Sequence, residues 1–167
     1  MIRVPRIVIS MPHIHDHIDF TVEVFVVYKN RVLLRMHDKY KMWLSVGGHI
    51  ELDEDPNQAA VREVKEEVGL EVVLADSRRP FTREESDYHE LIPPQFLNRH
   101  RVNPTHEHVT LTYFARANTD KTAVPATHEK SDECKWFTRE ELEENAEGVD
   151  ETIRCYALRA LEELKKK

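Results

Sequence analysis

The segment from Asp55 to Gly69 constrains the fold most, because it carries both ends of a helix and an apolar face between them. Asp55 is suited to cap the N-terminus of this helix, and Pro56 is suited to its first position. Gly69 is suited to the residue that follows the last turn. At about 100° per residue, three apolar residues share one stripe, which we expect to face the core. These residues are Val61, Val64 and Val68.

A different face of the same helix carries three carboxylates. Glu63, Glu66 and Glu67 stand at i, i+3 and i+4, so their side chains are neighbours. The like-charge pair of Glu63 and Glu67 costs roughly 0.2–0.5 kcal/mol. Glu66 and Glu67 also lie in the last turn, where the helix dipole disfavours each anion by about 0.3–1 kcal/mol. Taken alone, the patch fits a solvent-facing acidic surface, whereas a hard cation such as Mg²⁺ would turn it into a ligand set.

The residues around this helix follow a fixed spacing. Gly48 is followed after five residues by Glu54 and, after seven more, by Arg62-Glu63-Val64-Lys65-Glu66-Glu67-Val68-Gly69-Leu70. This pattern resembles the Nudix box, and each of its nine defined positions is matched. One position departs from many members of that family. Val46 stands where proline often precedes the double glycine, which leaves the loop less rigid.

The resemblance implies an α/β fold, the Nudix-type α/β/α sandwich with a mixed sheet, for a single domain over residues 1–167. It also implies a divalent cation, Mg²⁺ or Mn²⁺ in its place. The implied ligands are the carbonyl of Gly47, the carboxylates of Glu63, Glu66 and Glu67, and a loop carboxylate for which Glu129 is the first choice and Glu85, Glu90 and Glu107 are alternatives. Glu54 and Arg62 are expected to brace the box. Glu63 or Glu66 is expected to orient or deprotonate the attacking water.

For this family, such a site implies hydrolysis of a diphosphate linkage, in which the cation neutralises phosphate oxygens and acidifies a bound water. The expected substrate is a nucleoside di- or triphosphate or a related nucleotide derivative. ADP-ribose or a nucleotide sugar is the alternative, because the box does not separate these substrates. A non-catalytic nucleotide-sensing module would usually lack box carboxylates, which are intact here. An isomerase of the same fold would need a catalytic cysteine, and Cys134 and Cys155 both come late in the chain.

Composition bounds the partners and the location. The formal net charge of −7 argues against an extended nucleic-acid surface, although a bound cation can still attract an anionic substrate. We expect no secretory leader, because the apolar run in MIRVPRIVIS is short and interrupted, and no membrane span. With two cysteines and no CxxC pair, the cytoplasm is the expected compartment. A homodimer is compatible with the family, but the sequence identifies no interface.

Alternation and turn residues predict the remaining elements. Strands are expected at residues 19–28, 31–36, 46–50, 71–75, 107–117 and 133–137, and helices after Thr138 and over residues 150–167. Lys29 and Asn30 are expected to form the tight turn between the first two strands. Residues 1–18 are expected to be an N-terminal strand or extension. Residues 76–106 are polar and contain four prolines, so we expect a loop region that helps to set specificity.

Several residues outside the helix are expected to contact the substrate. These are His49, Arg99, Phe96 and Tyr40. The polar ones would meet phosphate and the aromatic ones would stack on a base, although core packing is the competing role for an aromatic ring. Histidines also gather in two groups, His13 with His15 and His17, and His106 with His108. A strand would place each group on one face, where a transition metal could bind. A polar surface near the substrate is the interpretation that the sequence favours.

Overall fold

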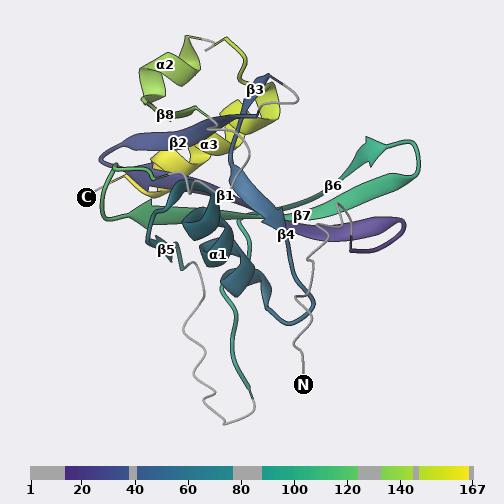
Figure 1. Cartoon of the computed structure of the whole chain (residues 1–167). Helices are drawn as coiled ribbons and strands as arrows, with labels where there is room; N and C mark the ends of the chain where they lie inside the picture. The colour runs from purple at the N-terminus through teal and green to yellow at the C-terminus, as the bar shows by residue number, and fades with distance from the viewer. Residues whose placement is uncertain (1–13, 38–40, 77–87, 124–132, 145–146, 166–167) are drawn as a thin grey trace, which may run out of the picture.

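The computed structural model describes residues 14–37, 41–76, 88–123, 133–144 and 147–165 (Figure 1). Its elements, in chain order, are β1 (Ile18–Tyr28), β2 (Arg31–His37), β3 (Met42–Leu44), β4 (Val46–His49), α1 (Pro56–Val68), β5 (Val72–Leu74), β6 (Phe96–Asn103), β7 (His106–Ala117), β8 (Cys134–Phe137), α2 (Arg139–Glu143) and α3 (Glu151–Glu163). Each strand and helix expected over residues 19–165 is found, within a few residues of its expected bounds. Among the described helices, none is long and apolar enough to cross a membrane.

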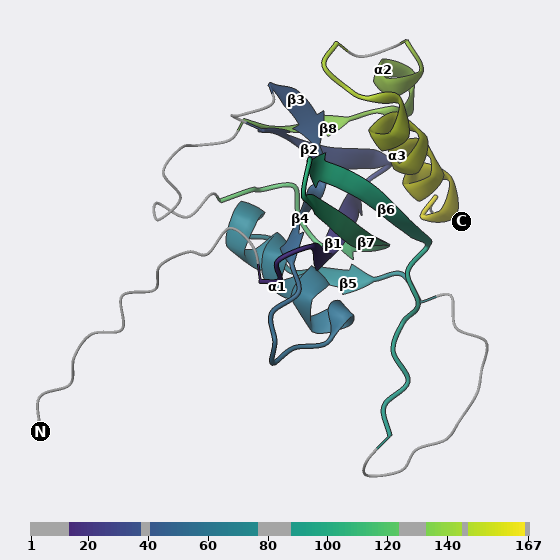
Figure 2. The ribbon, with the colours of Figure 1, turned by 90° about the vertical axis from the view of Figure 1, so that its right-hand side faces the viewer.

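The described strands form one mixed sheet. Strands β3, β2, β1, β7 and β5 lie in that order, with β4 paired to β1, β6 paired to β7 and β8 paired to β2. The long strands β1 and β7 run parallel, whereas β4 and β6 pair with them antiparallel. Helix α1 covers one face of the sheet, and α3 with α2 covers the other, as Figure 1 and Figure 2 show from two sides. This arrangement confirms the predicted α/β/α sandwich with a mixed sheet.

The two faces of the sheet bury separate apolar cores, because side chains alternate along each strand. Val24 and Val26 of β1 belong to the core beneath α1. The intervening Phe25 belongs to the core beneath α3. There it packs edge-on against Phe114 of β7, with 6.2 Å between ring centroids. The central strands therefore contribute to both layers and fix the positions of α1 and α3 relative to one another.

Helix α1 begins and ends where the sequence predicts. The side chain of Asp55 accepts hydrogen bonds from two backbone N–H groups of the first turn, and Gly69 follows the helix with φ at 69°. Only glycine adopts this left-handed conformation without a steric penalty. Val64 and Val68 are fully buried, while Val61 is partly buried beside the same core. The caps and the apolar stripe together set which face of α1 turns away from the sheet core.

The turn between β1 and β2 is also confirmed. Lys29 and Asn30 have φ values of 46° and 62°. Positive φ at both central residues is typical of the two-residue hairpin whose twist matches that of the flanking strands. The strand register then pairs Tyr28 with Arg31.

The loop expected over residues 76–106 needs a correction. Strand β6 lies within it and pairs with β7, from Phe96 opposite Thr112 to Asn103 opposite His106. Most side chains of β6 are exposed, so its sequence lacks the apolar alternation by which a strand is recognised. Residues 77–87 of this region lie outside the described residues, as do residues 1–13 of the predicted N-terminal extension.

The pairing of β1 with β7 brings polar side chains together on one face of the sheet. Thr21 lies opposite Thr110, and Glu23 lies opposite Thr112. The hydroxyl oxygens of Thr21 and Thr110 are 2.7 Å apart and share a hydrogen bond. Because side chains two residues apart share a face, Asp19 continues this polar row at the start of β1. The row runs beside the double glycine of β4, where the candidate site lies.

Candidate active site

The candidate site forms where the double glycine of β4 meets α1. A Cβ on Gly48 would lie 2.3 Å from Oε1 of Glu63. A Cβ on Gly47 would lie 2.1 Å from the backbone oxygen of Val22. Neither distance leaves room for a side chain, so the two glycines allow β4 to lie close to both β1 and the helix carboxylate.

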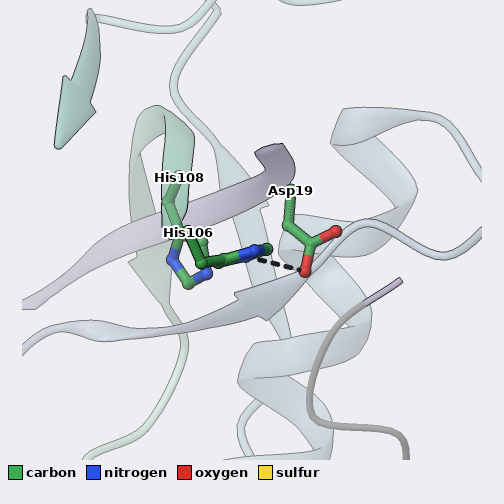
Figure 3. Close-up of side chains that lie close together, drawn as sticks. All are labelled: Asp19, His106 and His108. Carbon is green, nitrogen blue, oxygen red and sulfur yellow. Dashed lines mark ion pairs between the residues drawn. The ribbon is translucent and has the colours of Figure 1, made fainter. Parts of the chain in front are cut away.

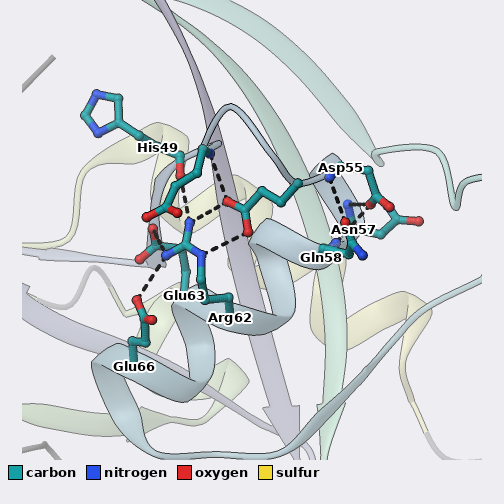
Figure 4. A network of polar contacts seen from close by, with 9 residues as sticks. His49, Asp55, Asn57, Gln58, Arg62, Glu63 and Glu66 are labelled. Atoms are coloured by element: carbon teal, nitrogen blue, oxygen red, sulfur yellow. Dashed lines mark hydrogen bonds and ion pairs between the residues drawn. The ribbon is translucent and has the colours of Figure 1, made fainter. Parts of the chain in front are cut away.

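Arg62 gathers the polar groups of the box around its guanidinium (Figure 4). Its Nε donates to Oε2 of Glu54 at 3.0 Å, and its Nη2 donates to Oε1 of Glu54 at 2.6 Å. Nη1 donates to Oε1 of Glu63 at 2.8 Å and to Oε2 of Glu66 at 3.0 Å. Nη2 also donates to the backbone oxygen of His49 at 2.9 Å. One arginine thus joins α1, the preceding loop and the end of β4. The bracing role of Glu54 and Arg62 stays a prediction with which these contacts are compatible.

These contacts affect the carboxylates differently. Hydrogen bonds from Arg62 lower the pKa of Glu54, and the same pairing raises the pKa of Arg62 above its usual range. Burial raises the pKa of Glu63 even though Arg62 is adjacent, since only 13% of the Glu63 side chain is exposed. The Glu66 side chain is 54% exposed. The buried charge of Glu63 is therefore only partly compensated by the protein.

Glu67 has a separate partner, which the sequence did not predict. Nη2 of Arg35 in β2 lies 2.5 Å from Oε1 of Glu67. The backbone N–H of Gly47 donates to Oε2 of the same carboxylate at 3.0 Å. Arg35 and Glu67 come from elements far apart in the sequence, so only the folded sheet reveals the pair. The solvent-facing alternative is wrong for Glu67, whose side chain is 14% exposed.

A pocket of about 770 Å³ lies beside Arg35 and the double glycine of β4. Its volume falls within the range of about 300–1,000 Å³ that is common for small-molecule sites. Gly47, Gly48 and His49 form one side, and Arg35 and Arg99 add positive charge. The predicted substrate contacts His49 and Arg99 therefore both line this pocket.

The other two predicted contacts are placed differently. Phe96 packs against the core beneath α3 and stacks on Tyr156, with 4.3 Å between ring centroids and 14° between ring planes. Tyr156 lines the pocket, whereas Phe96 is not among the described residues that line it. Tyr40 and the predicted loop ligand Glu129 lie outside the described residues.

Glu23 is a pocket residue that the sequence interpretation missed. It accepts hydrogen bonds from Oγ of Ser45 at 2.7 Å and from Oγ1 of Thr112 at 3.2 Å. Burial raises the pKa of Glu23. A signal was present, because Thr21 and Glu23 alternate with valines in a strand and so predict a polar row on one face.

Comparisons with known proteins place the chain in a family. A family model described as the NUDIX domain matches residues 19–157. The dihydroneopterin triphosphate diphosphatase of Haemophilus influenzae is 34% identical over 137 residues, which cover 77% of this chain and 82% of the relative. A solved structure described as a hydrolase of the NUDIX family from Clostridium perfringens is 35% identical, with a TM-score of 0.76 over 90% of this chain and 99% of that chain. The MutT protein of Methanosarcina mazei Go1 shares the fold at 18% identity, with a TM-score of 0.63 over 90% of this chain and 98% of that chain.

The matched region contains the whole segment from Gly48 to Leu70. The same segment supplies the helix carboxylates and the arginine that gathers them. This chain therefore belongs to the Nudix family, and it is a hydrolase that acts on a diphosphate.

Proposed function

We propose that this enzyme is a Mg²⁺-dependent pyrophosphohydrolase that cuts a nucleoside triphosphate, or a related triphosphate bearing a flat heterocycle, into diphosphate and a monophosphate. The observation that carries the proposal is the gathering of Glu63 and Glu66 by Arg62 next to Gly48 and His49. These two residues line a pocket together with Arg35 and Arg99. The name of the Haemophilus influenzae relative supports a triphosphate substrate and a diphosphate product.

The box residues fit a divalent cation. Glu63, Glu66 and Glu67 all come from one helix and offer only oxygen donors, and burial leaves the Glu63 charge only partly compensated. Oxygen donors of this kind favour Mg²⁺, with Mn²⁺ as its substitute. When bound, the cation would neutralise phosphate oxygens and acidify a water. The residues that would hold it are Glu63, Glu66, Glu67 and the carbonyl of Gly47, with Glu129 as a further predicted ligand.

The other groups of the site bind and orient. Arg62 holds Glu63 and Glu66 next to each other. One of these two carboxylates would orient or deprotonate the attacking water. Arg35 fixes Glu67 against β2. Arg99 is exposed in the pocket and is suited to an outer phosphate. Phosphoryl transfer depends mainly on such positioning and charge compensation.

ADP-ribose or a nucleotide sugar remains the alternative substrate. The box is compatible with cleavage of a triphosphate chain and also with cleavage of the diphosphate that joins the two halves of these molecules. An isomerase is disfavoured, since neither cysteine is part of the described pocket lining. Cys134 packs beside the core beneath α1, and Cys155 is exposed on α3. Both are free thiols, which suits the predicted reducing cytoplasm. The cytoplasmic location and a homodimer stay predictions.

A product analysis tests the substrate class. The purified enzyme would be incubated with Mg²⁺ and with dihydroneopterin triphosphate, nucleoside triphosphates, ADP-ribose and a nucleotide sugar in parallel. Phosphorus NMR would identify the products of each reaction. We expect diphosphate and a monophosphate from at least one triphosphate, at a higher kcat/KM than for any dinucleotide-type substrate. Turnover confined to ADP-ribose or the sugar would contradict the proposal and support the alternative.

The two glycines of β4 give a matched pair of variants. In Gly48→Ala the new Cβ meets the flexible end of the Glu63 side chain, so Glu63 must move while the backbone stays in place. We expect kcat to fall roughly 100-fold with little change in melting temperature, because a displacement of about 1 Å in a positioned group can cost that much. In Gly47→Ala the Cβ meets the backbone of Val22 instead. We expect that variant to lose stability in a thermal melt.

The two variants are expected to differ in which property they lose, activity for Gly48→Ala and thermal stability for Gly47→Ala. A Gly48→Ala enzyme with full activity would mean that the position of Glu63 does not matter for turnover. A Gly47→Ala enzyme that melts at the wild-type temperature would mean that β4 can shift away from β1.

A further inference from the structure

A cluster of carboxylate and imidazole side chains lies near the start of β1, apart from the box carboxylates. At its centre is Asp19, whose side chain is 0% exposed. The backbone N–H of His15 donates to Oδ1 of Asp19 at 2.6 Å, and that of Ile14 donates to Oδ2 at 3.1 Å. These bonds fix the carboxylate and tie the segment before β1 to the strand.

Imidazoles from two other strands converge on this carboxylate. Nε2 of His106 lies 3.3 Å from Oδ2 of Asp19, and Nε2 of His49 lies 3.2 Å from the same oxygen. Ligand atoms of Asp19, His106 and His108 all lie within 4.8 Å of one another (Figure 3). The parallel register explains the grouping, because it sets Asp19 directly opposite His108.

The hydrogen bonding of His106 points to a cation. Its Nδ1 lies 3.4 Å from the backbone oxygen of Asp16, which can only accept, so a hydrogen bond between them requires the hydrogen on Nδ1. In a neutral ring, Nε2 then presents a lone pair to the carboxylate of Asp19. The lone pair of Nε2 and the negatively charged carboxylate repel each other. A metal ion bound between them would replace this repulsion with a bond to each group. A ring N–H bonded to a backbone carbonyl is also the usual arrangement behind a metal-bound histidine.

We infer that Asp19, His106 and His108 form a transition-metal site, for Zn²⁺ or a similar borderline cation, distinct from the Mg²⁺ site of the box. Two imidazoles and one carboxylate are common Zn²⁺ ligands, whereas Mg²⁺ prefers oxygen alone. His49 is placed to supply a fourth ligand.

The position of the site indicates a structural role near the pocket. Asp19 is the second residue of β1, and His106 and His108 are the first and third residues of β7. His108 and His49 both line the pocket, and the backbone of His49 accepts from Arg62 of the box. A bound ion would therefore lock the segment before β1 to the pocket wall. Because it binds the folded chain, it would stabilise the native state by an amount that grows with the logarithm of the ratio of free metal concentration to Kd.

Metal binding by the full-length, untagged protein tests the inference. Zn²⁺ would be titrated calorimetrically in excess Mg²⁺, and the visible absorption of a Co²⁺-loaded sample would report imidazole ligation. We expect one tight Zn²⁺ per chain and a higher melting temperature with Zn²⁺. His106→Asn and His108→Asn should each weaken binding by roughly 100-fold or more, given that even groups behind the ligands contribute about 10–100-fold.

Two controls isolate the site. The chain has ten histidines, so one control must show that losing a nearby histidine is not enough to lose Zn²⁺. His100→Asn is this control for His106→Asn and His108→Asn. The ring centroid of His100 lies 5.6 Å from that of His108, but His100 is outside the ligand group. The second control, Glu66→Gln, changes only the box. Zn²⁺ binding at Asp19, His106 and His108 can therefore be tested even if the box does not bind Mg²⁺. Both variants should bind Zn²⁺ as the wild type does. The inference is overturned if the wild type binds no Zn²⁺, or if folded His106→Asn and His108→Asn variants still bind it tightly.

Discussion

Glu66→Gln is expected to lower kcat by roughly 100-fold or more, because a metal that stabilises transition-state charge contributes several kcal/mol. The change keeps the shape of the side chain and removes its charge. Glu66 is 54% exposed and receives one hydrogen bond from Arg62, so the fold should persist. Steady-state kinetics at saturating Mg²⁺, with a thermal melt of the same sample, would measure both effects.

Glu71→Gln is the matched control for this variant. Glu71 lies just beyond the same helix, is 68% exposed and pairs with Lys65 rather than with Arg62. It should retain wild-type kcat. If Glu66→Gln were as active as this control with Mg²⁺, the carboxylate of Glu66 would have no part in metal binding.

Arg62→Ala is expected to be the most destabilising single change in the site. It removes the shared partner of Glu54, Glu63 and Glu66 and leaves the buried charge of Glu63 without its nearest cation. Breaking such a partly buried network costs about 2–3 kcal/mol, somewhat less than the loss of a fully buried pair. For a chain of this size the melting temperature should fall by about 5–10 °C.

Arg159→Ala is the comparison for that loss. Arg159 pairs with Glu162 and Glu163 on the exposed face of α3. Pairs of this kind contribute little, so the melting temperature should change by about 2 °C or less. Equal losses in the two arginine variants would show that Arg62 is an ordinary surface residue.

The part of the site on helix α1 can be predicted from the sequence, because the residues that determine it lie within one continuous segment. Asp55 and Gly69 bound the helix, and the i, i+3, i+4 spacing places Glu63 beside Glu66 and Glu67. The degree of burial does not follow from that spacing. Glu63 is 13% exposed because α1 packs against the glycines of β4, a contact that periodicity alone does not encode.

The long-range part depends on strand pairing, which one sequence does not determine. Thr21 and Thr110 are 89 positions apart and meet only because β1 and β7 run parallel. The same pairing brings Asp19 to His106, although the sequence suggests only a short histidine pair on a strand. Strand β6 was missed for a different reason, since exposure removes the alternation that would predict it.

The most direct test of the central claim is the dependence of triphosphate hydrolysis on Mg²⁺. The enzyme would first be stripped with a chelator, and initial rates would then be measured across a Mg²⁺ titration, with the phosphorus products identified at each step. The box geometry predicts no turnover in the stripped enzyme and a saturable recovery with Mg²⁺ that yields diphosphate and a monophosphate. Full turnover in the presence of the chelator would contradict it.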